Sequence, residues 1–272
     1  MKKIIVAAIG LFTLATLNGQ AVEQRLPGAE EISNRRTSFN LEEIKVRWKK
    51  AALENCTGVP CAGGVSFTCG TSTVTDIDGN SYNTVLIGSQ CWTKSNLKVT
   101  KYNDGTAIPD ETANNAGWGG LTTGARSIHT GYTGSSSYIA TYGYLYNWYA
   151  ATDNRKICPT GWHIPTEPEW NSLFNSIGGI FVAGEKMTYT GSSLWTSLFT
   201  IVDNSSGFTA IPGGYRSRLN TFFGIGVVAQ FWGSSVNPSN SNRAWHFYIE
   251  NGGISGSYLD KSFGNSIRCL KD

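Results

Sequence analysis

The sequence is short of charge, of histidine and of long apolar runs. Only 15% of its residues are charged, and it has 3 histidines. After residue 17 no run approaches the roughly 18 apolar residues that a membrane-spanning helix needs. Residues 65–272 carry equal numbers of basic and acidic side chains, so this region is neutral. A neutral surface does not attract a phosphate backbone, which makes nucleic acid a poor partner.

Motifs for zinc binding and for nucleophilic catalysis are also missing. The cysteines contain no CxxC pair and no histidine spacing that is typical of a zinc site. His129, His163 and His246 lie far apart, and no nucleophile motif accompanies them. His163 stands between two apolar residues, which favours a structural histidine over a catalytic base. We therefore expect neither a metal ligand nor a catalytic residue.

The first 21 residues have the order of a secretory signal. Two lysines precede an apolar run over residues 4–17, and small or polar residues follow up to Ala21. The run is too short to span a bilayer. The pattern predicts a signal peptide over residues 1–21 and export to the periplasm, the cell surface or the medium. No cysteine lies near the predicted cleavage point, so lipid attachment is not expected.

Residues 22–64 read as a polar leader with a short amphipathic helix. Asn40 can cap a helix with Glu43 three residues later, and residues 41–54 place their apolar side chains on one stripe. This helix either lies on the main domain or forms a self-associating stalk that would make the protein an oligomer. Two heptads are too few to indicate a coiled coil.

Six cysteines in an exported chain indicate disulfides before metal ligands or nucleophiles. The sequence alone does not choose among the pairings. Cys56 and Cys61 are close enough to close a small loop, and Cys69 and Cys91 flank a predicted hairpin. The two cysteines that remain, Cys158 and Cys269, would tie the middle of the chain to its last strand.

The stretch from Cys158 to Trp170 carries the densest structural information. Residues 162–164 suit a short, half-buried strand, and Pro165 ends it because proline has no amide hydrogen to donate. Thr166 and Glu169 have the spacing of a capping box, which predicts a helix over residues 166–177. The apolar residues of this helix share one face, so we expect it to pack on a sheet; they are Trp170, Leu173, Phe174 and Ile177.

Most of the remaining sequence after residue 73 predicts strands and tight turns. Residues 74–77 and 82–87 are β-prone, with a turn at 78–80. The aromatic run 142–149 is either a packed core segment or a stacking surface for sugars. Further strands are expected from the segments 90–97, 208–216, 231–235, 244–249 and 266–270, with long polar and aromatic loops between the last of them.

The turn at residues 78–80 also resembles the beginning of a calcium loop. Asp76, Asp78 and Asn80 have the right spacing, but Ile87 stands where the closing carboxylate should be. We expect no cofactor, and calcium remains an alternative that no specific motif supports.

Residues 74–272 resemble the Fibrobacter succinogenes major paralogous domain, common in exported bacterial proteins. The resemblance rests on motifs in the family's order: DIDGNSYNTVLIGSQCWTKSNLK, YLYNWYAA, CPTGWHIPTEPEWNSL, GFTAIPGGYR, FWGSS and SIRCLKD. Its WHIPTEPEW and PGGYR landmarks are similar to those of sulfatase-modifying (formylglycine-generating) enzymes. The resemblance implies an α+β, C-type-lectin-like fold over residues 65–272, with short antiparallel strands, few helices and long irregular loops. It also implies the bridge between Cys158 and Cys269.

The chemistry of formylglycine-generating enzymes is not expected here. Those enzymes need a pair of reactive cysteines, and Cys269 is the only cysteine after Cys158. We therefore expect a non-catalytic binding domain that recognises a glycan or a surface protein through its C-terminal loops. Aromatic faces would stack on the ligand, and Arg and Asn side chains would orient it. The candidate ligand-binding residues are Tyr215, Arg216, Arg218, Trp232, Asn240, Asn242, Arg243, Trp245 and Tyr258.

Other interpretations of these residues and of the protein stay open. Trp232 and Trp245 lie in predicted strands and suit a core, and Arg216 suits a role in holding the turn at residues 213–214. The protein would alternatively be a structural or assembly subunit of the envelope that associates through residues 41–54. A third hypothesis is a variable ligand-binding protein of a diversity-generating retroelement, with variable codons over residues 215–263.

Overall fold

The computed structural model describes residues 12–17, 20–25, 66–113, 117–191, 194–196 and 201–272. It divides the chain into two units, residues 1–65 and 66–272. In the first unit, β1 (Phe12–Leu17) and β2 (Gln20–Arg25) pair antiparallel. The described residues contain no helix that is both long and apolar enough to cross a membrane.

Three predictions for the N-terminal part remain untested. The predicted helix over residues 41–54 and the predicted Cys56–Cys61 bridge lie outside the described residues. The signal peptide, with its cleavage near Ala21, also stays a prediction.

Residues 66–272 form a mixed α/β structure that is built mostly from strands. The first sheet has the order β10-β9-β11-β12-β13 and consists of β9 (Gly213–Arg216), β10 (Phe222–Ile225), β11 (Val228–Asn237), β12 (Asn240–Glu250) and β13 (Gly253–Asp260). The second has the order β3-β4-β5-β14-β8 and consists of β3 (Thr73–Thr75), β4 (Ser81–Ile87), β5 (Gln90–Thr93), β8 (Trp162–His163) and β14 (Leu270–Lys271). A small third sheet pairs β6 (Arg126–Ser127) with β7 (Leu145–Tyr146).

The helices are short and lie between the strands of the two large sheets in the sequence. They are α2 (Ser136–Tyr142), α3 (Trp148–Ala151), α4 (Glu167–Ser176) and α5 (Ile180–Met187), with 3-10 turns η1 (Trp118–Gly120) and η2 (Thr130–Tyr132). The predicted helix over residues 166–177 is confirmed as α4. The hydroxyl of Thr166 accepts from the Glu169 amide, and the Glu169 carboxylate accepts from the Thr166 amide at 2.7 Å. The predicted capping box is therefore present, and it sets where α4 begins.

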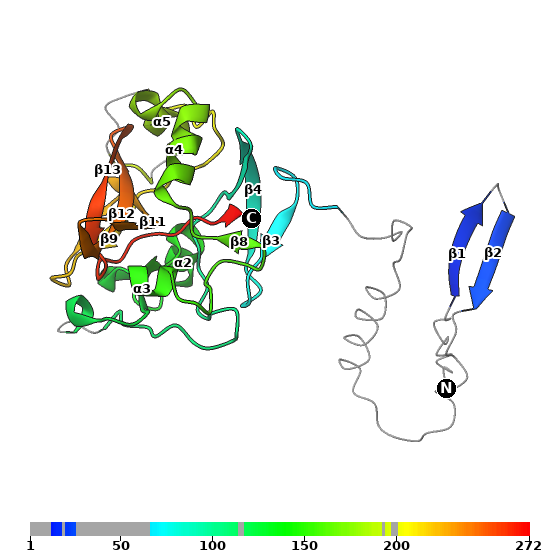
Figure 1. The fold of residues 1–272 in the computed structure, drawn as a ribbon, viewed down its shortest axis with the longest axis horizontal. Coiled ribbons are helices and arrows are strands. Elements are labelled where there is room, and N and C mark those ends of the chain that lie inside the picture. Colours follow the sequence, from blue (N-terminus) through cyan, green and yellow to red (C-terminus); the bar gives the residue numbers. More distant parts are fainter. Residues whose placement is uncertain (1–11, 18–19, 26–65, 114–116, 192–193, 197–200) are drawn as a thin grey trace, which may run out of the picture. The chain divides into compact units, whose positions relative to one another are not determined.

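The buried face of α4 joins the two large sheets. In Figure 1, α4 lies between β4 of the second sheet and the strands of the first. The ring centroid of Trp170 lies 4.5 Å from that of Trp92 on β5 and 4.5 Å from that of Phe247 on β12. Leu173 and Phe174 are buried in the same cluster. The apolar face read from the sequence thus forms the centre of one of the two hydrophobic clusters.

The second cluster contains the aromatic run over residues 142–149. Tyr144, Leu145 and Tyr146 are buried, and the hydroxyl of Tyr146 donates to the carbonyl of Val99 at 2.7 Å. Of the two interpretations of this run, the core segment is confirmed. Tyr142 and Trp148, near the two ends of the run, are partly buried and pack against the same cluster.

Two of the three predicted disulfides are confirmed. Cys69 bonds Cys91, and Cys158 bonds Cys269. The second bridge joins the segment before β8 to the segment before β14, two strands that also pair with each other. The end of the chain is thus held between β5 and β8 of the second sheet by backbone pairing and by a covalent bond.

The C-terminal region differs from the expected set of strands and long loops. β11 and β12 form a long hairpin with a tight turn at residues 238–239, and β13 follows after another short turn. The strands β10 and β13 and the helix α5 were not predicted. β13 is rich in Gly and Ser, which have low intrinsic strand preference, and β10 is only four residues long and contains Gly224. Antiparallel pairing supplies the backbone partners that make these residues strand-forming, with β12 for β13 and with β9 for β10.

Candidate functional site

Three of the predicted ligand-binding residues are buried and belong to the core. Arg216, Trp232 and Trp245 have exposed fractions of 0%, 0% and 4%. The indole nitrogen of Trp232 donates to the carbonyl of Tyr146 at 2.8 Å, and Trp245 packs against Phe247. These side chains support the sheet and do not face a ligand. The prediction that these three residues bind a ligand at the surface is therefore wrong. The sequence pattern does not show which face of a strand other segments cover.

Asn240, Asn242 and Arg243 lie together at the tip of the β11–β12 hairpin, and all three are exposed. They belong to β12 and not to a loop. Tyr258 lies in β13, and its hydroxyl donates to the Glu167 carboxylate at the start of α4 at 2.6 Å. The hydrogen bond to Glu167 raises the pKa of Tyr258 above its ordinary value.

Tyr215 and Arg218 lie elsewhere, at β9 and in the turn that follows it. Gly214, next to Tyr215, pairs with Ala229 of β11, whereas the hairpin tip begins at Asn237. The path along β11 from Ala229 to Asn237 is roughly 25 Å at about 3.3 Å per residue. The predicted set therefore divides into two separate surface regions, and the structure does not bring them together.

Tyr215 lies in a row of three aromatic rings at the surface. The Tyr215 ring centroid lies 5.6 Å from that of Phe223 and 6.2 Å from that of Phe263, with ring planes inclined by 31° and 27°. Phe223 is 47% exposed, and the other two rings are half-buried. Tyr215 and Phe223 are partners across β9 and β10, so they share a face of the sheet. We call Phe223, Tyr215 and Phe263 the aromatic row.

The polar groups of this surface include the Tyr215 phenol and the nearby carboxylate of Glu250. Arg218 is exposed in the turn between β9 and β10. Burial, and then the nearby carboxylate of Glu250, raise the pKa of Tyr215 above its ordinary value, so its hydroxyl remains protonated at neutral pH. Phe223 and Phe263 were missed in the sequence. The adjacent pair Phe222-Phe223 between Asn220 and Gly224 is the signal that would have indicated a short strand here.

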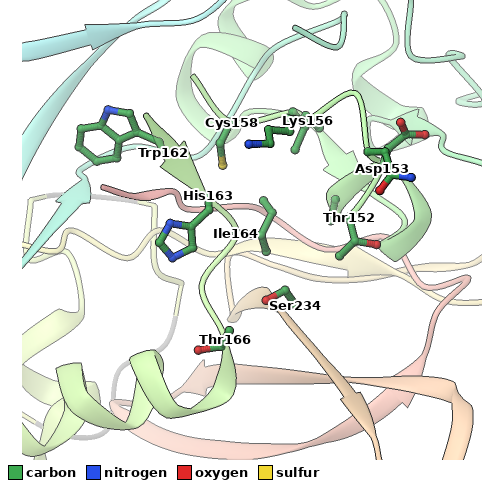
Figure 2. Close-up of a pocket in the computed structure, with 12 residues that line it drawn as sticks. Thr152, Asp153, Lys156, Cys158, Trp162, His163, Ile164, Thr166 and Ser234 are labelled. Carbon is green, nitrogen blue, oxygen red and sulfur yellow. The ribbon is translucent and has the colours of Figure 1, made fainter. Parts of the chain in front are cut away.

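A cavity of about 370 Å³ lies next to the central motif (Figure 2). It is lined by the end of α3 and the segment after it, by Cys158, by β8 and by Ser234 of β11. Ser234 lies in an irregular part of β11, where the pairing with β12 shifts register between Trp232 and Val236. This bulge is fastened to the start of α4: the Ser234 amide donates to the carbonyl of Pro165 at 2.8 Å, and the Ser235 hydroxyl accepts from the Glu167 amide at 2.8 Å.

His163, at the edge of the cavity, lies between two carboxylates. Its Nδ1 is 2.6 Å from Asp272 Oδ1, and its Nε2 is 3.0 Å from Glu169 Oε1. Each ring nitrogen of His163 thus lies within hydrogen-bond distance of a carboxylate oxygen. Burial tends to raise the pKa of Glu169, but hydrogen bonds from Thr166 and the contact with His163 outweigh it and hold the pKa below its ordinary value. With both nitrogens occupied, His163 has the contacts of a structural histidine.

His246 contacts a serine but lacks the surroundings of a catalytic base. Its Nε2 lies 3.0 Å from the Ser257 hydroxyl, and burial lowers the pKa of His246 to about 4. The buried Nδ1 has no hydrogen-bond partner among the residues that the structure describes. A serine–histidine pair needs an acidic group on that nitrogen to orient and charge the ring. The geometry therefore does not assemble a triad at His246.

The turn that resembles a calcium loop is held by hydrogen bonds from protein groups. Asp76 Oδ1 accepts from the amides of Asp78 and Asn80, and Oδ2 accepts from the Tyr82 hydroxyl at 2.6 Å. Asp78 accepts from Thr100 and lies 3.2 Å from the Lys101 ammonium. The predicted turn between β3 and β4 is confirmed. In the described ranges no group of three or more acidic, histidine or cysteine side chains is arranged to hold a metal.

Comparison with known proteins gave one match. The Fibrobacter succinogenes major domain matches residues 85–271, which is more than half of the chain. Neither the curated proteins nor the solved structures gave a match. The matched range includes the central motif, both strands of the long hairpin and the closing bridge between Cys158 and Cys269. The chain therefore belongs to the Fibrobacter succinogenes major domain family.

Proposed function

We propose that this protein is an exported, non-catalytic binding domain that recognises a glycan through the surface around the aromatic row. The observation that carries the proposal is the row itself: three rings with similar orientation, one of them nearly half exposed, on the face of a rigid sheet. Such rings stack on the apolar faces of sugars, and a surface protein is the alternative ligand.

The surroundings of the row suit a neutral, hydroxylated ligand. Tyr215 offers a neutral hydroxyl, the carboxylate of Glu250 near it is an acceptor, and Arg218 in the turn after β9 is an exposed donor. Asn240, Asn242 and Arg243 at the hairpin tip are too distant to contact the same sugar unit. They would contact only a second part of an extended ligand.

Within this proposal the fold is C-type-lectin-like. Mostly antiparallel sheets, few helices and a bridge from the central segment to the end of the chain support it. Export is supported by the two disulfides, because such bonds persist in oxidising compartments. Non-catalytic action is supported by the occupied nitrogens of His163 and the unpaired Nδ1 of His246 in the described structure.

The test is a glycan-array screen of the full chain followed by alanine substitution. Phe223→Ala removes the most exposed ring of the row, and we expect it to weaken binding about tenfold, which is the loss of one stacking contact of about 1.4 kcal/mol. Arg218→Ala should also weaken binding, whereas Asn242→Ala with Arg243→Ala should not affect a single-sugar ligand. Arg218→Ala and Asn242→Ala with Arg243→Ala should keep the melting temperature of the parent because these side chains are exposed, whereas Phe223→Ala should lower it slightly because the ring packs against Tyr215.

The outcomes separate the alternatives. If Asn242→Ala with Arg243→Ala abolishes binding and Phe223→Ala does not, the site lies at the hairpin tip. A blank array with folded protein would contradict the glycan proposal and favour a protein ligand. Running the array with calcium and with a chelator shows whether a metal takes part.

A further inference from the structure

We propose that the cavity beside the central motif is a second binding site, and that it takes a single neutral pyranose unit. The cavity shares no residue with the aromatic row. This proposal rests on the proposed function in one respect only, which is that the ligand is a glycan. The experiment below therefore tests the two sites separately.

The size of the cavity suits a small ligand. Its volume of about 370 Å³ lies at the lower end of the roughly 300–1,000 Å³ that is typical of small-molecule sites. Its walls come from separate parts of the chain that are fastened together. The Cys158–Cys269 bridge holds one wall, and the hydrogen bond from Ser234 to Pro165 holds another. The cavity is thus preformed, which lowers the entropic cost of binding.

One wall of the cavity is apolar. Ala151, Ile157, Ile164 and Cys158 line it with buried aliphatic and sulfur atoms. In Figure 2, Ile164 lies in the middle of the site, between Lys156 above and Ser234 below. An apolar wall of this kind packs against the C–H face of a sugar ring and offers nothing to a strongly hydrated ion.

The rim carries polar groups with unused hydrogen-bonding capacity. Thr152 and Thr166 are already engaged, with the carbonyl of Trp148 and with Glu169. By contrast, the Ser234 hydroxyl, the Asn154 amide and the Lys156 ammonium have no partner among the described residues. These groups supply donors and acceptors on different sides of the mouth, which is the arrangement that a ring with hydroxyls along its edge requires.

The rim carries charges of both signs. Asp153 pairs with Arg155 at 2.8 Å, Lys156 adds a cation, and two carboxylates flank His163. A ligand with a net charge would be attracted by one part of the rim and repelled by another. This balance favours a neutral ligand over an acidic or a basic one.

Lys156 offers an unusually clean test of the site. Its backbone lies at φ 60°, the left-handed region that glycine adopts without strain. Lys156→Gly therefore removes the ammonium while relieving the backbone, so the variant should be at least as stable as the parent. Any loss of binding in Lys156→Gly then reports on the ligand and not on folding.

The experiment titrates the 15N-labelled chain with the methyl glycosides of glucose, mannose and galactose and with N-acetylglucosamine. We expect at least one of these sugars to give saturable shifts of the amides of Ile164, Ser234 and Lys156. Lys156→Gly and Ser234→Ala should each weaken that binding about fivefold, the effect of one lost hydrogen bond. Ser172→Ala, on the exposed side of α4, is the matched control and should change nothing.

Two results would overturn the cavity assignment. One is the absence of shifts at these amides with all four sugars. The other is a sugar whose binding is lost in Phe223→Ala and unchanged in Ser234→Ala, which would place it on the aromatic row and leave the proposed function standing. A third result would count against the aromatic row instead. If Phe223→Ala alters neither the binding in the cavity nor the binding on the array, the row is not the site of the proposed function.

Discussion

The guanidinium carbon of Arg216 lies 4.2 Å from the centroid of the Trp118 ring. The same guanidinium donates to the carbonyl of Glu111 at 2.7 Å and to the side chain of Asn220 at 2.9 Å. It therefore ties β9 to the segment around η1 and to the turn before β10. Burial lowers the pKa of Arg216 to about 10, which still leaves it charged at neutral pH. Arg216, which was expected to bind a ligand, is thus a buried residue that holds three segments together.

Arg216→Ala should unfold the protein far more readily than Arg218→Ala. Removal of the buried Arg216 side chain leaves a cavity and two partly buried acceptors without a donor, which together cost about 3 kcal/mol of the free energy of unfolding. Arg218 is exposed, so its removal should change that free energy by less than about 0.5 kcal/mol. Urea denaturation of both variants is the measurement. Equal midpoints would show that Arg216 does not hold these segments together.

The two adjacent glycines of the PGGYR motif should respond very differently to alanine. Gly214 has φ 66°, and a Cβ there would collide with the carbonyl oxygen of Phe223, so Gly214→Ala should cost more than about 3 kcal/mol of stability. A Cβ on Gly213 would meet nothing nearer than the Ser266 hydroxyl at 3.5 Å. Gly213→Ala should therefore fold almost normally. Thermal melts of the pair check this, and a normal melting temperature for Gly214→Ala would contradict the β9–β10 geometry.

Glu169 should make stability depend on pH at the acidic end. The pKa of Glu169 in the folded protein is held below its ordinary 4.5, so its ionised form is favoured by folding. This contribution is present above pH 4.5 and is lost as the pH falls through the folded pKa. Glu169→Gln should therefore be less stable than the parent near neutral pH, and the difference should shrink in strong acid.

The hydrogen bonds from Thr166 are one cause of the lowered pKa of Glu169, so substitutions of Thr166 test the same interaction from the other side. Thr166→Ala removes the hydroxyl that bonds Glu169 at 2.8 Å and should cost about 1 kcal/mol, whereas Thr166→Ser keeps a hydroxyl and should cost less. A stability difference between the parent and Glu169→Gln that stays constant down to strong acid would show that the carboxylate is not stabilised by the fold.

Removal of the Cys158–Cys269 bridge should cost more stability than removal of Cys69–Cys91. The bridges close loops with sequence separations of 111 and 22 residues. Constraint of the unfolded chain then contributes about 5 and about 3 kcal/mol. Paired cysteine-to-alanine variants, compared by urea denaturation, measure both. The reverse order would mean that strain or residual structure dominates over loop length.

The features that the sequence predicted correctly depend on neighbours along the chain. The capping box of Thr166 and Glu169, the apolar face of α4 and the turn at residues 78–80 all arise from spacings of a few residues. Such local patterns determine structure because the interacting groups are already close in the unfolded chain. Cys69–Cys91 and Cys158–Cys269 were also anticipated, the second with support from the family resemblance.

The candidate site was predicted only in part. Tyr215 and Arg218 do lie at the surface, but Trp232 and Trp245 are enclosed, and Asn242 lies at the distant hairpin tip. An alternating strand does not show which of its faces is covered by other segments. Phe263 joins Tyr215 only because residue 264 pairs with Arg216 of β9, a contact between segments almost fifty residues apart.

By itself, the amino-acid sequence determined the family, the position of α4, and the mostly β character of the region that follows residue 73. Only the tertiary structure decided which rings are exposed, that the aromatic row and the hairpin tip are separate, and that a cavity forms beside His163. The physical reason is that exposure and cavities depend on how distant segments cover one another. Which segments cover one another depends on the packing of the two sheets around α4, and no short stretch of sequence determines that packing.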